Sequence, residues 1–189
     1  MSVRRAVWQF LGPGSGYAFA EGRRGLSDDQ ENAIYFGQRL PEPLPDVEVG
    51  PLSEGRIGHV IGTSFSAFVV SPDVRALLDS AAPLQFVPVR LPRHGGGREP
   101  GYAIMNLLAH VPCLDFERSD YDRMPGHPDR LLGVRRLVLH EIPADAPALF
   151  HVAELPGAIL VRADLRARLE ALDGAGEFVE IADYTWGLA

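Results

Sequence analysis

The 189-residue sequence predicts a single mixed α+β domain. Short β-branched and aromatic runs alternate along the chain with segments of helical spacing, which indicates strands interleaved with helices. Hydrophobic residues make up 46% and charged residues 23% of the chain, close to the averages of globular proteins, so we expect it to bury a core of its own. A chain of this length favours one domain over two.

Residues 1–55 are expected to form an irregular N-terminal part with edge strands, and residues 56–189 the core of the domain. The first part is rich in glycine, proline and acidic residues, which favour turns over long helices. Within it, residues 6–11 and 33–40 are expected to be strands, because turn-forming residues bound both runs.

The core is expected to begin with a strand, helix, strand unit. Residues 68–70 (FVV) predict a strand, Ser71 suits the N-cap of a helix, and Pro72 suits its first position. Apolar residues at helical spacing continue to Leu78. Residues 84–91 predict the second strand, which Pro88 would place at a sheet edge or a bulge.

The C-terminal segment repeats this design. Residues 159–161 predict a strand, residues 163–172 a helix with its leucines on one face, and residues 177–181 a strand. Aligning Asp73 with Asp164 superposes the two units at an offset of 91 residues (164 minus 73), so we expect a duplicated strand, helix, strand unit.

Three further segments lie between the two units. Residues 93–100 predict a glycine-rich loop tip, residues 102–111 a strand or a helix, and residues 136–139 a strand.

Charge and hydropathy disfavour two classes of partner. The formal net charge is −7 and the pI about 5.3, so the chain should repel the phosphate backbone of nucleic acids, whereas a basic protein partner remains compatible. No stretch approaches the roughly 18 uninterrupted apolar residues that a membrane-spanning helix needs. Cys113 has no second cysteine to pair with, and the N-terminal apolar run is too short for a signal peptide, which predicts a cytoplasmic protein.

The sequence shows no recognisable catalytic, cofactor or metal site. Cys113 has His110, His140 and Asp115 near it in the sequence, residue types that a thiol nucleophile would need, but spacing alone supplies no geometry, and a buried cysteine is the simpler interpretation. The six histidines show none of the short spacings that assemble a metal site. We therefore expect a binding protein, not an enzyme, without cofactor or metal.

The most informative polar segment is residues 114–123 (LDFERSDYDR). One interpretation is a strand end that leads into a solvated turn. The other is an acidic recognition surface whose carboxylates steer a basic partner while Tyr121 supplies an amphipathic contact. The candidate carboxylates are those of Asp115, Glu117, Asp120 and Asp122.

A second candidate contact lies at the C-terminus. Asp183, Tyr184 and Trp186 place two large aromatic side chains beside an acid, as a protein interface does. Packing of this tail onto the sheet explains the same residues equally well.

The order of several short segments carries a family resemblance. These segments are FVVS at 68–71, VRALL at 74–78, QFVPV at 85–89, YAIMNLL at 102–108, CLD at 113–115 with Ser119, and ILV at 159–161. In this order, over roughly the last two thirds of the chain, the sequence resembles the immunity proteins of bacterial polymorphic-toxin loci, in particular the myxobacterial-type immunity family usually numbered eleven. The tryptophan-rich motif of that family has its nearest match here at Trp186.

The resemblance implies an α+β protein, made in the cytoplasm, that neutralises a toxin effector, often a nuclease, by binding it stoichiometrically. An acidic protein is suited to such a basic partner. Two alternatives stay open: a small cytoplasmic enzyme that uses Cys113 or a histidine, and a structural or regulatory scaffold module. A homodimer is possible, and constitutive self-association in place of a toxin partner would favour the scaffold module.

Overall fold

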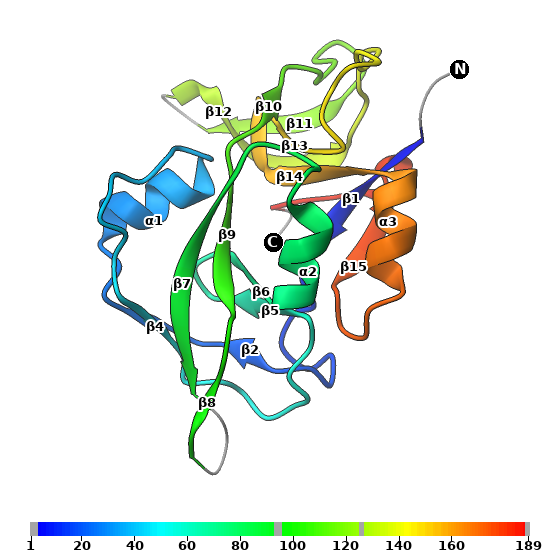
Figure 1. Ribbon diagram of the computed structural model, residues 1–189. Coiled ribbons are helices and arrows are strands. Elements are labelled where there is room, and N and C mark those ends of the chain that lie inside the picture. The colour runs from blue at the N-terminus through cyan, green and yellow to red at the C-terminus, as the bar shows by residue number, and fades with distance from the viewer. Residues whose placement is uncertain (1–3, 93–95, 125–126, 188–189) are drawn as a thin grey trace.

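The computed structural model describes residues 4–92, 96–124 and 127–187 (Figure 1). Strands dominate the α+β fold, and the helices are short. The elements are β1 (Arg5–Gln9), β2 (Phe19–Ala20), β3 (Arg23–Arg24), α1 (Asp28–Tyr35), β4 (Val47–Val49), β5 (Val60–Thr63), β6 (Phe68–Val70), α2 (Pro72–Leu78), β7 (Leu84–Pro92), β8 (Arg98–Glu99), β9 (Ala103–Leu107), β10 (His110–Val111), β11 (Asp120–Met124), β12 (His127–Arg136), β13 (Leu149–Val152), β14 (Leu155–Arg162), α3 (Ala163–Glu170), β15 (Glu177–Glu180) and the 3-10 turn η1 (Ile181–Asp183).

The smaller main sheet has the strand order β10-β13-β14-β1-β15. The predicted strand at residues 6–11 is present as β1, but it is not an edge strand. It lies between β14 and β15 and runs antiparallel to both, so the start of the chain is built into the sheet formed by its end.

The larger sheet has the order β2-β5-β6-β9-β7-β4-β3, with β8 paired to β7. Its two edge strands, β2 and β3, come from residues 1–55, where edge strands are expected. The edge position expected for Pro88 is wrong, because β7 lies between β9 and β4. The backbone nitrogen of Val89 donates to the carbonyl oxygen of Tyr102, just before β9, at 3.2 Å. Because successive backbone nitrogens of a strand point to opposite sides, the nitrogen of Pro88, which has no hydrogen to donate, points away from β9.

Both predicted strand, helix, strand units are present, as β6–α2–β7 and β14–α3–β15. In each unit the two strands run parallel and flank a third strand antiparallel to both, which is β9 in the first unit and β1 in the second. Helices α2 and α3 pack against each other where the two sheets meet (Figure 1). The common topology is compatible with a duplication, which itself stays a prediction.

Alternation along the strands builds two cores. Phe68 and Val70 point into the space between the sheets, where they join Trp8 and Phe150, whereas Val69 lies on the opposite face of the large sheet, under the N-terminal segments. Every residue of β6 is therefore buried, which accounts for its continuous apolar run.

Local capping signals explain two of the helices. Helix α2 begins as predicted, with the Ser71 hydroxyl accepting from the Val74 backbone nitrogen at 3.4 Å. The strand expected at residues 33–40 is wrong, because this region contains the end of helix α1. Ser27 and Gln30 form a reciprocal capping box at its start, and acidic side chains occupy its first turn.

The remaining predicted segments differ in outcome. Residues 102–111 form strands β9 and β10, whereas the strand expected at 136–139 ends at Arg136, and Leu139 makes only an isolated bridge. In the glycine-rich loop, residues 93–95 lie outside the described residues, and the following Gly96 has φ of +99°. In the described ranges no helix combines the length and the apolar character needed to cross a membrane.

Candidate partner-binding surface

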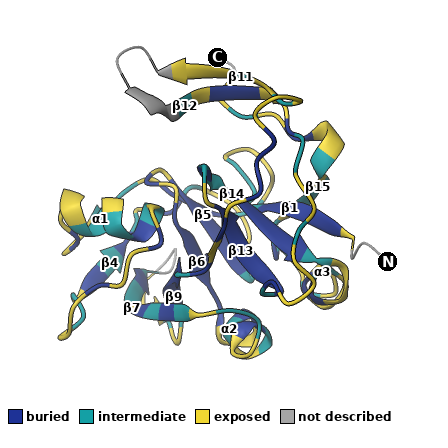
Figure 2. Cartoon of the chain, turned by 90° about the horizontal axis from the view of Figure 1, so that it is seen from above, coloured by how far each residue is buried: buried dark blue, intermediate teal, exposed yellow. Residues whose placement is uncertain are grey.

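Five of the residues that the sequence singles out lie on one projecting feature, the turn at 115–119 followed by the hairpin of β11 and β12. They are Asp115, Glu117, Asp120, Tyr121 and Asp122. Figure 2 shows this hairpin standing off the two main sheets, with the C-terminal segment beside it. Its pairing is irregular, since the register shifts three times between Asp120 and Met124. Such irregularities end a regular sheet and favour an exposed, twisted ribbon.

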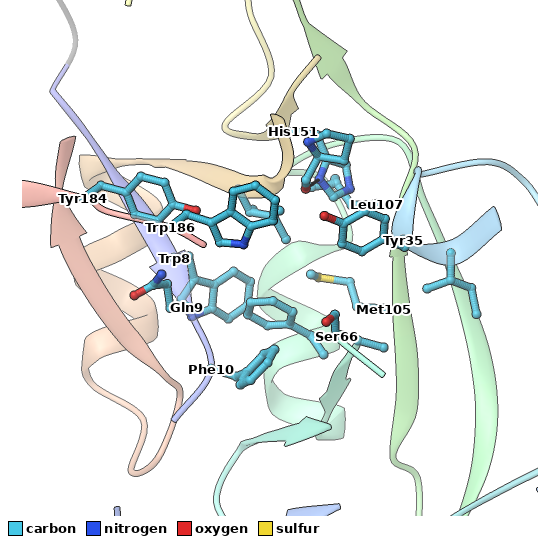
Figure 3. A pocket seen from close by; sticks show the side chains of 16 residues that line it. Trp8, Gln9, Phe10, Tyr35, Ser66, Met105, Leu107, His151, Tyr184 and Trp186 are labelled. Atoms are coloured by element: carbon cyan, nitrogen blue, oxygen red, sulfur yellow. Dashed lines mark hydrogen bonds between the residues drawn. The ribbon is translucent and has the colours of Figure 1, made fainter. Parts of the chain in front are cut away.

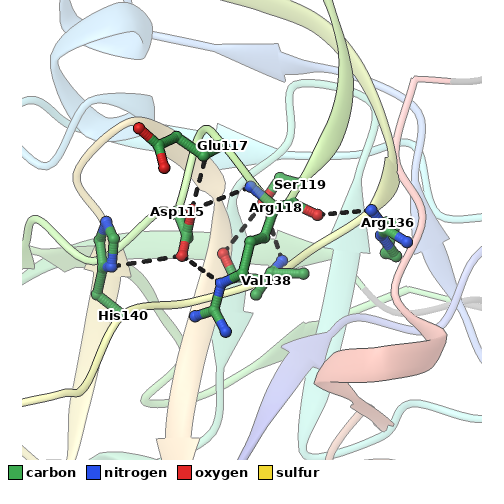
Figure 4. Close-up of polar contacts among 7 residues, drawn as sticks. All are labelled: Asp115, Glu117, Arg118, Ser119, Arg136, Val138 and His140. Carbon is green, nitrogen blue, oxygen red and sulfur yellow. Dashed lines mark hydrogen bonds and ion pairs between the residues drawn. The ribbon is translucent and has the colours of Figure 1, made fainter.

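Asp115 lies at the base of this feature, and its carboxylate points towards the residues of the turn and His140 (Figure 4). Only 5% of the residue is exposed, and its carboxylate accepts from the backbone nitrogens of Glu117 at 3.1 Å and Arg118 at 3.0 Å. The Arg118 side chain donates a further bond at 2.6 Å, and His140 Nδ1 lies 3.5 Å away. The hydrogen bond from the Arg118 side chain lowers the pKa of Asp115, so the carboxylate stays ionised as the anchor of the turn.

Asp120 and Asp122 are both bound by one side chain of the partner strand. The Arg135 guanidinium donates to Asp120 at 2.8 Å and to Asp122 at 2.5 Å, and these bonds lower the pKa of both carboxyls. The pairing places both acids and the arginine on one face of the hairpin.

The charges of this surface are balanced. Residues 115–123 together with Arg135 and Arg136 carry four carboxylates and four guanidinium groups, so their formal charges cancel. The recognition surface stays a prediction, but its charge is mixed, because Arg135 and Arg136 of the opposite strand join the two arginines of the segment. The net charge of −7 comes from other parts of the chain.

An aromatic cluster lies next to the charged one. The rings of Phe116 and Tyr121 meet edge to face with their centroids 5.4 Å apart, and the Arg123 guanidinium lies 5.3 Å from each ring centroid. Phe116 is 40% exposed, and Leu132 on β12 is 50% exposed. Together with Phe36 on the body, these two are the exposed large hydrophobic residues of the described chain.

The C-terminal residues pack onto the molecule, as one of the two interpretations of the tail expects. Trp186 exchanges two backbone hydrogen bonds with Val134 of β12, at 2.8 and 2.9 Å, and so extends the hairpin by one bridge. Tyr184 is buried, with 1% exposed, and Asp183 is exposed in η1. Of these three residues, Asp183 is the one that offers its side chain freely to a partner.

The alternative nucleophile is placed unfavourably for catalysis. Cys113 is 1% exposed, and burial raises the pKa of its thiol to about 11, so the thiol stays protonated at neutral pH. Asp115 and His140 lie beside each other, but their contacts belong to the turn. Among the described residues, no three His, Cys, Asp or Glu side chains converge as metal ligands.

Sequence reasoning missed Phe116, Arg123, Leu132 and Arg135 as members of this surface. An available signal was the alternation of Asp120 and Asp122, which predicts a strand whose acidic face needs a basic neighbour. The position of that neighbour depends on the irregular register, which the sequence does not reveal.

Comparison with known proteins gives one match. The model of the Immunity protein family (Imm11) matches residues 12–183, which include the larger sheet, the projecting hairpin and every strand of the smaller sheet except β1. A search of curated proteins finds no match. The match covers most of the chain and agrees with the resemblance carried by its short segments, so this chain belongs to the Imm11 immunity protein family.

Proposed function

We propose that the chain neutralises a cognate toxin by binding it stoichiometrically, and that the turn at 115–119 with the β11–β12 hairpin is the contact surface. The observation that carries the proposal is the cluster of exposed Phe116 and Arg123 around half-buried Tyr121, on a feature that projects from the body of an immunity-family protein. Tyrosine, arginine and exposed aromatic groups are the side chains that most often dominate protein interfaces.

The proposed contact combines two kinds of interaction. Phe116 and Leu132 supply apolar area that is exposed in the free protein, so burying it would contribute to affinity. Glu117, Asp120 and Asp122 surround this area and would form the polar rim, with Asp183 on the neighbouring tail. Asp115 and Tyr184 act on the surface indirectly in this proposal, because both side chains are buried.

The proposed partner is a basic toxin domain, in keeping with a nuclease, and the proposed place of action is the cytoplasm. The chain carries a net charge of −7, which attracts a basic protein over distances of about one Debye length. A nuclease needs positive charge to hold its substrate, so an acidic inhibitor associates with it rapidly. In this proposal the chain acts without catalysis, which agrees with the buried and protonated thiol of Cys113.

The test is co-expression of the tagged chain with the products of its neighbouring genes, followed by purification at moderate salt and mass spectrometry. We expect a basic toxin domain at a one-to-one ratio, with roughly 1,200–2,000 Å² buried in the complex. Recovery of the chain without a partner, or as a homodimer, would contradict the proposal.

A matched pair of variants locates the surface. Phe116→Ala on the turn should weaken toxin binding by roughly tenfold to a hundredfold. Phe36→Ala removes an almost equally exposed phenylalanine from the end of α1, 37% against 40%, and should leave binding unchanged. Equal effects of the two variants, or a larger effect of Phe36→Ala, would move the contact surface away from the hairpin.

A further inference from the structure

A cavity of about 300 Å³ lies between the two sheets and under the C-terminal tail (Figure 3). Six aromatic side chains line it, and they come from four separate segments of the chain. They are Trp8, Phe10, Tyr35, Phe68, Tyr184 and Trp186. The volume falls at the lower end of the range for small-molecule sites, so a ligand of one or two rings would fill it.

Two buried polar atoms of the cavity wall have no hydrogen-bond partner among the described residues. The Tyr184 hydroxyl is one of them, although only 1% of the residue is exposed, and Figure 3 shows it directed towards Trp186 and the cavity. His151 Nε2 is the other, on a residue that is 5% exposed. A buried polar group without a partner costs stability, so such groups in a cavity wall indicate a missing partner.

The contact of Nδ1 shows which ring nitrogen of His151 carries the proton. Nδ1 lies 2.5 Å from the carbonyl oxygen of Pro156, which can only accept, so Nδ1 carries the proton. Burial lowers the pKa of His151 to about 4, so the ring is neutral at pH 7, and the backbone of Leu107 is a second polar neighbour of the ring. The polar group that the cavity offers to a ligand is therefore the Tyr184 hydroxyl, as a donor.

The cavity carries no charged side chain. Its described lining residues include no Asp, Glu, Lys or Arg. The other polar side chains are Gln9, Ser66, Tyr35, Trp186 and Trp8, whose indole nitrogen donates to the Ala175 carbonyl at 2.8 Å. Ionic ligands would lose their hydration without gaining a counter-charge, which disfavours them strongly. Flat aromatic walls favour stacking on a planar ring.

We propose that this cavity binds a small, uncharged heteroaromatic molecule of the nucleobase or nicotinamide type, stacked on the aromatic walls, with its acceptor facing the Tyr184 hydroxyl. The cavity shares Trp186 with the tail that extends the hairpin, and its test needs no toxin.

The two tryptophans of the chain, Trp8 and Trp186, both line the cavity, so intrinsic fluorescence reports on its occupancy directly. The experiment titrates the full chain with nicotinamide and with adenine, and with nicotinate as a charged control of the same ring size. We expect saturable emission changes with at least one neutral ring, with a dissociation constant on the order of 1 mM or tighter, and none with nicotinate. Free tryptophan amide, titrated in parallel, corrects for collisional quenching.

Two variants separate binding from folding. Tyr184→Phe should weaken binding about threefold to tenfold, while thermal unfolding shows stability equal to or above that of the wild type, because an unpaired hydroxyl is removed. Gly157→Val should abolish binding by filling the cavity, since a Cβ at this position lies 3.4 Å from the Tyr35 hydroxyl and 3.6 Å from Trp186 Nε1. If Gly157→Val does not fold, the smaller Gly157→Ala replaces it.

Tyr17→Phe serves as the matched control, because it removes an exposed tyrosine hydroxyl outside the cavity. It should bind as the wild type does. The proposal is overturned if neither nicotinamide nor adenine gives a saturable change, if nicotinate binds equally well, if both cavity variants bind like the wild type, or if crystals soaked in the two neutral rings show only ordered water in the cavity.

Discussion

Different interactions stabilise the two-sheet body and the β11–β12 hairpin. In the body, alternating apolar residues fill the space between the sheets, and Phe150, Trp8 and Leu160 are almost fully buried. The hairpin is held by a buried aspartate, by Arg135 bound to two acids and by the pair of exposed Phe116 and half-buried Tyr121. The body thus supplies stability, and the hairpin presents side chains that a partner can contact. This division of roles can be tested by perturbing each region separately.

The largest expected effect is on the body. Phe150→Ala should lower the free energy of unfolding by about 3–5 kcal/mol, because it leaves a cavity in the core between the sheets. Leu132→Ala on the hairpin removes a half-exposed side chain and should cost less than about 0.5 kcal/mol. Urea unfolding measures both. Similar losses from the two variants would show that the hairpin is part of the cooperative core.

The body should also respond to mild acid through His151. Its pKa is about 4 in the folded protein and 6.5 in the unfolded chain, so the unfolded state binds more protons between these values. Stability should therefore fall by about 3 kcal/mol as the pH drops from 6.5 to 4, and change little through this group above pH 6.5. Chemical unfolding at a series of pH values measures this slope. A His151→Gln variant with the same slope would contradict the assignment.

The hairpin should respond most to loss of its anchor. Asp115→Ala removes the acceptor of two backbone nitrogens and of Arg118, so hydrogen exchange should accelerate in residues 115–124 and toxin binding should weaken. Exchange in β13 and β14 should stay as in the wild type. Asp115→Asn keeps an oxygen acceptor and should give an intermediate effect. Accelerated exchange throughout the body would show that Asp115 supports the whole fold.

The smallest expected effect concerns salt. The hairpin charges cancel locally, whereas the whole chain is negative, so salt should act on long-range steering and not on the contacts. Raising salt from about 0.1 M to about 1 M should slow association with a basic toxin and leave the dissociation rate almost unchanged. Surface plasmon resonance separates the two rates. A dissociation rate that rises steeply with salt would show that ion pairs dominate the contact.

The fold could be predicted from the sequence where local signals are strong. Ser71 and Pro72 mark the start of α2, and β-branched runs mark β6 and β14. Helix α1 was missed because the apolar residues after Ala33 outweighed the capping box of Ser27 and Gln30. The place of β1 between β14 and β15 was not predictable, because it depends on pairing between the two ends of the chain.

The candidate surface stays a prediction, and its mixed charge could not be predicted from the sequence. An aspartate in a polar segment is expected to be exposed, but Asp115 is buried. Its burial depends on the closed turn and on His140, which lies 25 residues further along the chain (140 minus 115). Arg135 neutralises two acids from the opposite strand, across an irregular register. The cavity has no sequence signal at all, because its walls come from residues as distant as Trp8 and Trp186.

The central claim is that the hairpin contacts the toxin, and hydrogen exchange of the free and the toxin-bound chain tests it most directly. We expect slower exchange on binding in the turn at 115–119 and in the described parts of β11 and β12, with α2 and α3 unchanged. Protection confined to α2 and α3, or to the edge strands β2 and β3, with the hairpin exchanging as in the free protein, would contradict the claim.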